Sequence, residues 1–151
     1  MSCGILFNHE SHLRDPSFFS AKIIQGAIQV QRGLISEILV GDLEARADWG
    51  YARDFVEAFQ VLARRDVPND YVIATGETRT VRDFLSAVFG VFDLDWKDHV
   101  QPDPSWTART QNIEKANPSK IFAETSWRPT LGFEDFVRLL VSDHLSQGKN
   151  A

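Results

Sequence analysis

A group of polar and charged side chains near the N-terminus could hold a negatively charged ligand. Its members are Asn8, His9, Glu10, Ser11, Arg14 and Lys22. They follow an apolar run, Gly4–Phe7, that predicts a buried strand, and ligands of open α/β sheets bind at the carboxyl ends of strands. An arginine could hold a diphosphate there through its planar fork, and a lysine as a point charge. The residue types alone leave a second interpretation open, a solvated loop that caps a helix.

The motifs of self-contained catalytic sites are missing from these 151 residues. The nine glycines never form G-x-G-x-x-G or G-x-x-G-x-x-G, the turns whose backbone amides approach a pyrophosphate. A tyrosine base with its lysine needs Y-x-x-x-K, but Phe55 and Thr75 lie four residues after the only tyrosines, Tyr51 and Tyr71. P-loop, G-x-S-x-G and H-E-x-x-H motifs are also absent. The sequence therefore predicts no catalytic residue and no metal site.

Composition narrows the class of protein and its partners. The chain is long enough, and with 43% hydrophobic residues apolar enough, for the core of one domain. Its net charge of -5 is spread along the chain without a basic run, which argues against a nucleic-acid binder. A single cysteine excludes an internal disulfide, no apolar stretch could span a bilayer, and the first residues do not resemble a signal peptide. We therefore expect a cytoplasmic protein that binds neither membrane nor nucleic acid.

The apolar periodicity predicts an alternation of strands and helices. Strands are expected at 4–7, 38–40 and 71–74. Helices are expected over 17–32, over 51–65, after Thr80, after Pro118 and after Gly132. Thr80 with Asp83 three residues on has the spacing of a capping box, and the segment 93–117 is expected to be irregular. The alternation is typical of the α/β class.

Three short strands are too few for a complete doubly wound sheet. The first strand would need neighbours that these residues do not supply, so we expect an open apolar edge and a chain that self-associates or is marginally stable. Cys3 is expected to be a buried filler at the strand start. Four tryptophans are expected to pack rather than to stack on a ligand. They are Trp49, Trp96, Trp106 and Trp127.

Several segments, in order along nearly the whole chain, resemble the GDP-mannose 4,6-dehydratases, which are extended short-chain dehydrogenases/reductases. Residues 4–11 read G-I-L-F-N-H-E-S, as that family does. Residues 48–56 resemble its R-D-W-G-x-A-x-D-Y-V segment, residues 70–77 read D-Y-V-I-A-T-G-E, and residues 81–84 resemble V-R-E-F. Residues 117–120 and 126–129 fit D-P-S-K and G-W-x-P.

The resemblance implies an activity and a cofactor. Such enzymes use tightly held NADP, or NAD, to oxidise C4 of GDP-mannose, eliminate water across C5–C6 and return the hydride to C6. The product is GDP-4-dehydro-6-deoxy-D-mannose, a precursor of deoxyhexoses such as fucose and rhamnose. In the family the glycine-rich turn, the acid/base Thr and Glu and the Tyr–Lys pair precede the G-I-L-F strand. We therefore expect the N-terminal dinucleotide-binding half to be absent and this lyase fragment to be inactive alone.

The resemblance also assigns site residues. His9 and Arg14 match positions that contact the nicotinamide cofactor, the arginine often across a subunit interface. The substrate positions are Asn8 and Lys22, near the diphosphate and nucleotide, and Arg109 and Asn112, which match R-P-x-E at the nucleotide end. The match departs from the family in three places: Asn112 replaces the glutamate, the segment before residue 117 is shortened, and the S-P-R-R loop keeps only its second arginine.

A further departure concerns the diphosphate itself. The arginine of R-D-W-G, expected to meet the diphosphate, is Ala47 here. Loss of one charge-assisted contact of that kind costs about 1.5–3 kcal/mol of binding free energy.

The fold expected from the resemblance is the C-terminal portion of an extended short-chain dehydrogenase/reductase. Residues 1–151 would form a single incomplete unit, in which the last part of a Rossmann-type sheet is interleaved with the small α/β domain that binds the GDP-sugar. The expected partners are GDP-mannose or GDP, and either a second copy of the chain or a complementary N-terminal half. Three hypotheses stay open: the substrate-binding part of a dehydratase, a non-catalytic module that binds nucleotide sugars or docks on a partner, and a degenerate product without function.

Overall fold

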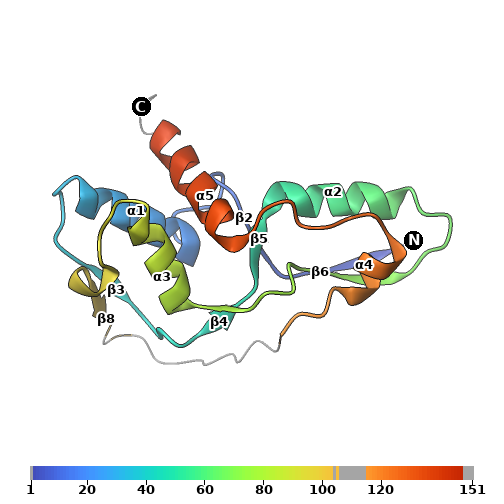
Figure 1. Cartoon of the computed structure of the whole chain (residues 1–151), viewed down its shortest axis with the longest axis horizontal. Helices are drawn as coiled ribbons and strands as arrows, with labels where there is room; N and C mark the ends of the chain where they lie inside the picture. The colour runs from blue at the N-terminus through green and yellow to red at the C-terminus, as the bar shows by residue number, and fades with distance from the viewer. Residues whose placement is uncertain (1, 104, 106–114, 148–151) are drawn as a thin grey trace.

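The computed structural model describes residues 2–103, 105 and 115–147 as two groups of elements along its longest axis (Figure 1). The first, the three-helix group, contains α1 (Phe19–Gln31), α3 (Val81–Gly90) and α5 (Phe133–Gln147). The second, the α2 group, contains α2 (Ala52–Ala63), α4 (Ser119–Glu124), β1 (Cys3–Leu6) and β6 (Asp70–Ile73). None of the helices in the described part is long and apolar enough to cross a membrane.

The described strands form four short pairs. Three pairs are parallel: β1 with β6, β2 (Asn8–Glu10) with β5 (Trp49–Tyr51), and β3 (Ile38–Val40) with β8 (Val100–Pro102). One pair is antiparallel, β4 (Arg46–Ala47) with β7 (Arg79–Thr80). The β2–β5 pair lies between the two groups in Figure 1, so the polar end of the first predicted strand runs through the middle of the molecule.

The three-helix group packs around one apolar core. Ile24, Phe84 and Val137, one from each helix, are fully buried in it. Close approach is needed where β3 crosses α1: a Cβ atom on Gly26 would lie 2.7 Å from Cγ2 of Ile38. Helix α1 ends at Gln31, and Gly33, two residues on, has a φ of 68° in the left-handed region that favours glycine.

The α2 group has its own core beneath Phe55. The ring of Phe55 meets Trp127 edge-on at 6.3 Å between centroids, and the Trp127 indole donates a hydrogen bond of 2.7 Å to the carbonyl oxygen of Asp54. Trp127 and Trp49 are both buried, which confirms that these two tryptophans pack. Trp96 is half-buried, and Trp106 lies outside the described residues.

The predicted helices and strands are present close to their expected bounds. The capping box is also confirmed, because the Asp83 amide donates to the Thr80 hydroxyl at 3.0 Å and the Thr80 amide donates to the Asp83 carboxylate at 2.8 Å. The prediction that the segment 93–117 is irregular was wrong for two stretches, the 3₁₀ turn η1 (Trp96–Asp98) and strand β8. A three-residue strand ending in proline has no periodicity that a sequence could reveal.

The first strand is present but was wrongly predicted to be buried. Ile5 and Leu6 are 51% and 41% exposed, and Cys3 is exposed as well. Strand β1 pairs only with β6 in the described part of the chain, so its other edge offers unpaired backbone groups beside apolar side chains. Phe59 of α2, which packs against Gly4, is 43% exposed and enlarges this apolar surface.

Two buried carboxylates hold the loops around the centre of the molecule. Asp48 accepts hydrogen bonds from the Thr75 amide at 2.9 Å, the Thr75 hydroxyl at 2.8 Å and the Gly76 amide at 2.8 Å. Asp54 accepts from the Thr130 amide at 2.9 Å and the Thr130 hydroxyl at 2.7 Å. The segment 48–54 is therefore tied both to the loop that follows β6 and to the loop that precedes α5.

Replacing Asp54 by alanine should destabilise the fold. The substitution leaves the Thr130 donors without their acceptor, so we expect the free energy of unfolding to fall by about 1–3 kcal/mol in urea titration. Asp66→Ala, which removes an exposed carboxylate just after α2, is the matched control and should change it by less than about 0.5 kcal/mol. Equal effects of the two substitutions would contradict a tethering role for Asp54.

The open edge of β1 should drive self-association. A lysine at an edge strand opposes pairing with another chain, so Ile5→Lys should lower the weight-average mass measured by sedimentation at a given concentration. Leu34→Lys places the same charge on an exposed apolar residue in the loop after α1, away from this edge, and should leave that mass unchanged. A wild-type chain that is monomeric and melts cooperatively would show that the edge is already protected.

Candidate functional site

A pocket of about 390 Å³ lies where two strands end and a third begins. Gly41 and Asp42 follow β3, and Asp103 follows β8, at the strand ends where ligands of α/β sheets bind. Asn8 is the first residue of β2. Helix α1 closes one side with Lys22, after which we name it the Lys22 pocket. The remaining lining residues are Ser17, Phe19, Ile23, Leu39, Val40, Ala45, Arg46, Ala47, Trp49 and Val81.

The charged side of the Lys22 pocket is balanced. Lys22 and Arg46 supply two cations, and Asp42 and Asp103 supply two carboxylates. Hydrogen bonds from the hydroxyl and amide of Ser105, assisted by the charge of Lys22, lower the pKa of Asp103, which keeps this carboxylate ionised beside the lysine. Lys22 is consequently not an isolated point charge, and an anion in this pocket competes with Asp103 for it.

The opposite side of the Lys22 pocket is apolar. Phe19 stacks on Trp49 at 5.7 Å between ring centroids, and Ile23 and Val40 continue the surface. Trp49 itself is buried against Phe84, with ring centroids 5.2 Å apart, so Phe19 rather than the tryptophan is the aromatic ring that faces outward. One apolar wall with a few convergent polar groups is the usual composition of a small-molecule site.

Strand β2 sends its side chains to two different places. Asn8 lines the Lys22 pocket, whereas the ring of His9 stacks on Phe55 of α2 at 5.0 Å between ring centroids. The His9 Nδ1 atom lies 2.9 Å from the carbonyl oxygen of Phe7, which can only accept, so Nδ1 carries a proton in this hydrogen bond. The alternation of a strand thus separates Asn8 from His9 although they are neighbours in sequence.

Glu10 anchors the loop that follows β2. It is buried, accepts a hydrogen bond of 2.6 Å from the Ser20 hydroxyl, and lies 3.2 Å from Nε of Arg14. Burial raises the pKa of Glu10 above its usual 4.5, while the Ser20 hydrogen bond and the charge of Arg14 oppose that rise. The Arg14 guanidinium also lies 4.0 Å from the centroid of the Phe18 ring. Arg14 therefore folds back onto its own loop.

Of the predicted site residues, the structure brings Asn8 and Lys22 into one pocket. His9 and Arg14 lie outside its lining, and Arg109 and Asn112 fall outside the described residues. The sequence analysis missed Arg46, Asp42 and Asp103 as lining residues. Arg46 was detectable as the neighbour of the substituted Ala47, but Asp103 depends on the unforeseen β3–β8 pair.

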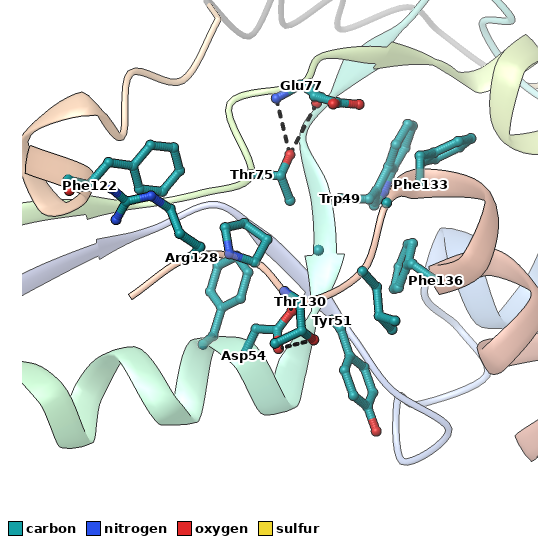
Figure 2. A pocket seen from close by; sticks show the side chains of 15 residues that line it. Trp49, Tyr51, Asp54, Thr75, Glu77, Phe122, Arg128, Thr130, Phe133 and Phe136 are labelled. Atoms are coloured by element: carbon teal, nitrogen blue, oxygen red, sulfur yellow. Dashed lines mark hydrogen bonds between the residues drawn. The ribbon is translucent and has the colours of Figure 1, made fainter. Parts of the chain in front are cut away.

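A second pocket, of about 320 Å³, lies between α2 and the start of α5 (Figure 2). Asp54, Thr75, Glu77, Arg128 and Thr130 in its lining already have hydrogen-bond partners. Figure 2 shows Asp54 bonded to Thr130, and Arg128 donates to the carbonyl oxygens of Phe122 and Trp127. Side chains whose hydrogen-bonding groups are occupied in this way stabilise loops, so the Lys22 pocket is the better candidate for ligand binding.

Solved structures with this arrangement of elements are extended short-chain dehydrogenases/reductases. RMD from Pseudomonas aeruginosa complexed with NADPH superposes with a TM-score of 0.81 at 17% identity, covering 93% of this chain and 46% of that one. The Thermus thermophilus UDP-glucose 4-epimerase complex with NAD gives 0.70 at 28% identity, covering 94% of this chain and 45% of that one. The chain therefore has the fold of part of such an enzyme, which confirms the predicted fold class.

The sequence comparison narrows this class to one family. The family model for GDP-mannose 4,6 dehydratase matches residues 1–140. GDP-mannose 4,6 dehydratase 1 of Arabidopsis thaliana is 39% identical over 148 residues, which cover 97% of this chain and 41% of that protein. The chain belongs to the GDP-mannose 4,6-dehydratase family, as its motifs predicted. It spans about two fifths of the length of the curated relatives it matches first.

The buried Glu10 should make stability depend on pH in a defined direction. A raised pKa means that the folded protein binds this proton more tightly than the unfolded chain, so stability falls as pH rises from 4.5 through the folded-state pKa and is constant above it. Glu10→Gln removes that dependence. Urea unfolding of both proteins from below pH 4.5 upward should show the wild type losing free energy of unfolding relative to Glu10→Gln.

Glu37→Gln, at an exposed glutamate, is the control for the loss of one negative charge. Its difference from wild type should not follow the same curve. A Glu10→Gln difference that is constant with pH, or that shrinks as pH rises, would show that Glu10 is ionised in the folded protein as readily as in the unfolded chain.

Proposed function

We propose that this chain is the substrate-binding part of a GDP-mannose 4,6-dehydratase. The reaction of the complete enzyme would convert GDP-mannose into GDP-4-dehydro-6-deoxy-D-mannose and water, a lyase step in deoxyhexose biosynthesis. The observation that carries the proposal is the Lys22 pocket, which lies at the ends of β3 and β8 and contains Asn8 and Lys22, two of the residues assigned to the GDP-sugar. The single cysteine, which excludes an internal disulfide, supports a cytoplasmic setting for the same proposal.

In this proposal the two sides of the pocket divide the nucleotide sugar between them. The guanine base packs on the apolar side against Phe19 and Val40, where an aromatic ring and a branched side chain offer flat contact area. The diphosphate lies on the charged side near Lys22 and Arg46, with the Asn8 amide as a further donor. Arg109 and Asn112 belong to the proposed nucleotide end of the site.

The nicotinamide cofactor fits these residues poorly. NADP would accept and return the hydride in the complete reaction, and His9 and Arg14 are the residues proposed to contact it. Arg14 is engaged with Glu10 and Phe18, and the 151 residues contain no glycine-rich turn for a pyrophosphate. We therefore assign no catalytic step to the 151 residues and propose that, without the rest of the enzyme, they neither bind the cofactor nor perform the dehydration.

The proposed partner is the nucleotide-binding half of a dehydratase, paired along the open edge of β1. Ile5 and Leu6 expose apolar surface there, and the curated relatives are more than twice as long as the matched region. A parallel strand added at this edge would satisfy the free backbone groups and cover the apolar side chains. A second copy of the chain is the alternative occupant, in a homo-oligomer.

A second candidate function is a binding module without chemistry. The observation that favours it is Ala47, a buried methyl group in the lining where the family motif has an arginine. With two cations balanced by two carboxylates, the Lys22 pocket offers a diphosphate little net attraction. A module of this kind would bind nucleotide sugars or dock on a relative without turning substrate over.

Titration calorimetry with GDP-mannose and with GDP tests the proposed function. We expect binding in the micromolar range, and loss of about tenfold or more in affinity for Lys22→Ala, because a charge-assisted contact to phosphate is removed. Lys97→Ala, at an exposed lysine in η1, is the matched control and should bind as the wild type does. A folded chain that gives no heat with either ligand, or a Lys22→Ala variant that binds normally, would contradict the assignment.

A further inference from the structure

A third cavity lies beside the Lys22 pocket, and Arg46 lines both. It measures about 520 Å³ and is lined by Arg46, Gly76, Glu77, Thr78, Arg79 and Lys115. We propose that this basic hollow is a binding site for a phosphate group, separate from the charged side of the Lys22 pocket. The site follows from the hollow's own residues; only the source of the phosphate, a nucleotide sugar or a free anion, depends on the proposed function.

The lining of the basic hollow is mainly cationic, although the Asp83 carboxylate lies near enough to Arg79 and Arg46 for their charges to help lower its pKa. Arg46, Arg79 and Lys115 are cationic, and Glu77 is the only acidic residue in the lining. Glu77 is occupied by Arg79, at 2.7 Å between its carboxylate and the guanidinium. Within the described residues, Arg46 and Lys115 form no ion pair. A phosphate between these two side chains would gain attraction that the balanced Lys22 pocket does not offer.

Two buried polar atoms in the hollow have no hydrogen-bond partner in the described part of the chain. They are the hydroxyl oxygen of Thr78 and Nε of Arg79. Leaving a buried donor unsatisfied costs about 1–3 kcal/mol, and native proteins rarely retain such groups without a reason. Both atoms are closed off from solvent, so a phosphate in the hollow would accept from Thr78 and Arg79 only after their side chains turn toward it.

The backbone around the hollow is held in place before any ligand binds. Strand β7 pairs with β4 in a register that sets Arg79 opposite Ala47 and Thr80 opposite Arg46. The Arg79 guanidinium also lies 5.1 Å from the centroid of the Phe133 ring. These contacts fix one wall of the hollow, which lowers the entropy lost on binding.

The opposite wall depends on the turn at Gly76. Its φ of 82° is in the left-handed region that favours glycine, and a Cβ atom there would lie 3.2 Å from Cγ of Pro118, a tight contact that would require the two segments to separate slightly. Asp48 holds the same turn through the amides of Thr75 and Gly76. The turn thus brings the segment that carries Lys115 beside Thr78.

The position of the hollow bears on the arginine that the family motif has at residue 47. Ala47 supplies no charge, but Arg79 is its direct neighbour across the β4–β7 pair, and side chains opposite each other in such a pair lie on the same face. Arg46, which lines both cavities, connects the two. The positive charge that Ala47 does not supply on β4 is therefore present on β7, in Arg79.

Titration of the full chain with inorganic phosphate and with pyrophosphate tests the site directly. We expect binding that weakens with added salt, as screened charges require. Lys115→Ala and Thr78→Val should each reduce pyrophosphate affinity by about threefold to tenfold or more, the range expected for the loss of one hydrogen bond to a charged ligand. Lys97→Ala, the control used for the Lys22 pocket, should leave it unchanged. Thr78→Val conserves side-chain volume, and circular dichroism checks that each variant folds.

A second titration identifies the source of the phosphate. GDP is titrated into the chain with and without saturating pyrophosphate. Competition, together with weaker GDP binding by Lys115→Ala, means that the phosphates of the nucleotide reach the basic hollow. Unchanged GDP affinity with pyrophosphate still bound means that the hollow takes a separate anion. Both outcomes support the phosphate site.

Two results would overturn the proposal. One is a folded chain that binds neither phosphate nor pyrophosphate. The other is binding that Lys115→Ala and Thr78→Val leave intact but Lys22→Ala abolishes, because the anion would then occupy the Lys22 pocket. If pyrophosphate binds in a Lys115-dependent way while GDP and GDP-mannose give no heat, the hollow stands and the proposed function fails.

Discussion

The buried carboxylates of Asp48 and Asp54 fix the loops on which the Lys22 pocket and the basic hollow depend. Each accepts hydrogen bonds from a backbone amide and a threonine hydroxyl, so each satisfies its own negative charge and fixes a loop at the same time. Asp48 sets the turn at Gly76 that shapes the basic hollow. Asp54 holds the loop before α5, whose helix packs against α1 and α3. Figure 2 shows the contact between Asp54 and Thr130 at the junction of the two groups.

The alternation of strand β2 organises the chemistry proposed for this chain. Asn8 faces the Lys22 pocket and His9 faces α2, so one three-residue strand separates the residue assigned to the nucleotide sugar from the residue assigned to the cofactor. Glu10 lies on the same side as Asn8 and is buried against α1 through Ser20. The order of Asn8, His9 and Glu10 in the sequence therefore decides which side chain lies on which face of β2. A one-residue slip of the β2–β5 register would move each side chain to the opposite face.

Local signals made much of the fold predictable. Helix α1 and its glycine stop, and the capping box at Thr80, follow from residues within one or two turns of each other, and the family resemblance supplied Asn8 and Lys22. Pairings between distant short strands were not accessible: β8 joins β3 across about sixty residues, and it brings Asp103 to Lys22. The exposure of Ile5 was equally hidden, because an apolar run looks the same whether its neighbours are present or not.

The pairing of Ala47 with Arg79 links two positions that a sequence comparison would treat as independent. Like charges directly opposite in an antiparallel pair repel each other, so a second arginine at position 47 would face the first across β4 and β7. Substitutions at the two positions should therefore be epistatic, with the effect of either depending on the residue at the other. Family members that keep the arginine of R-D-W-G should carry a residue other than arginine or lysine opposite it, and a survey of that residue pair can refute the coupling.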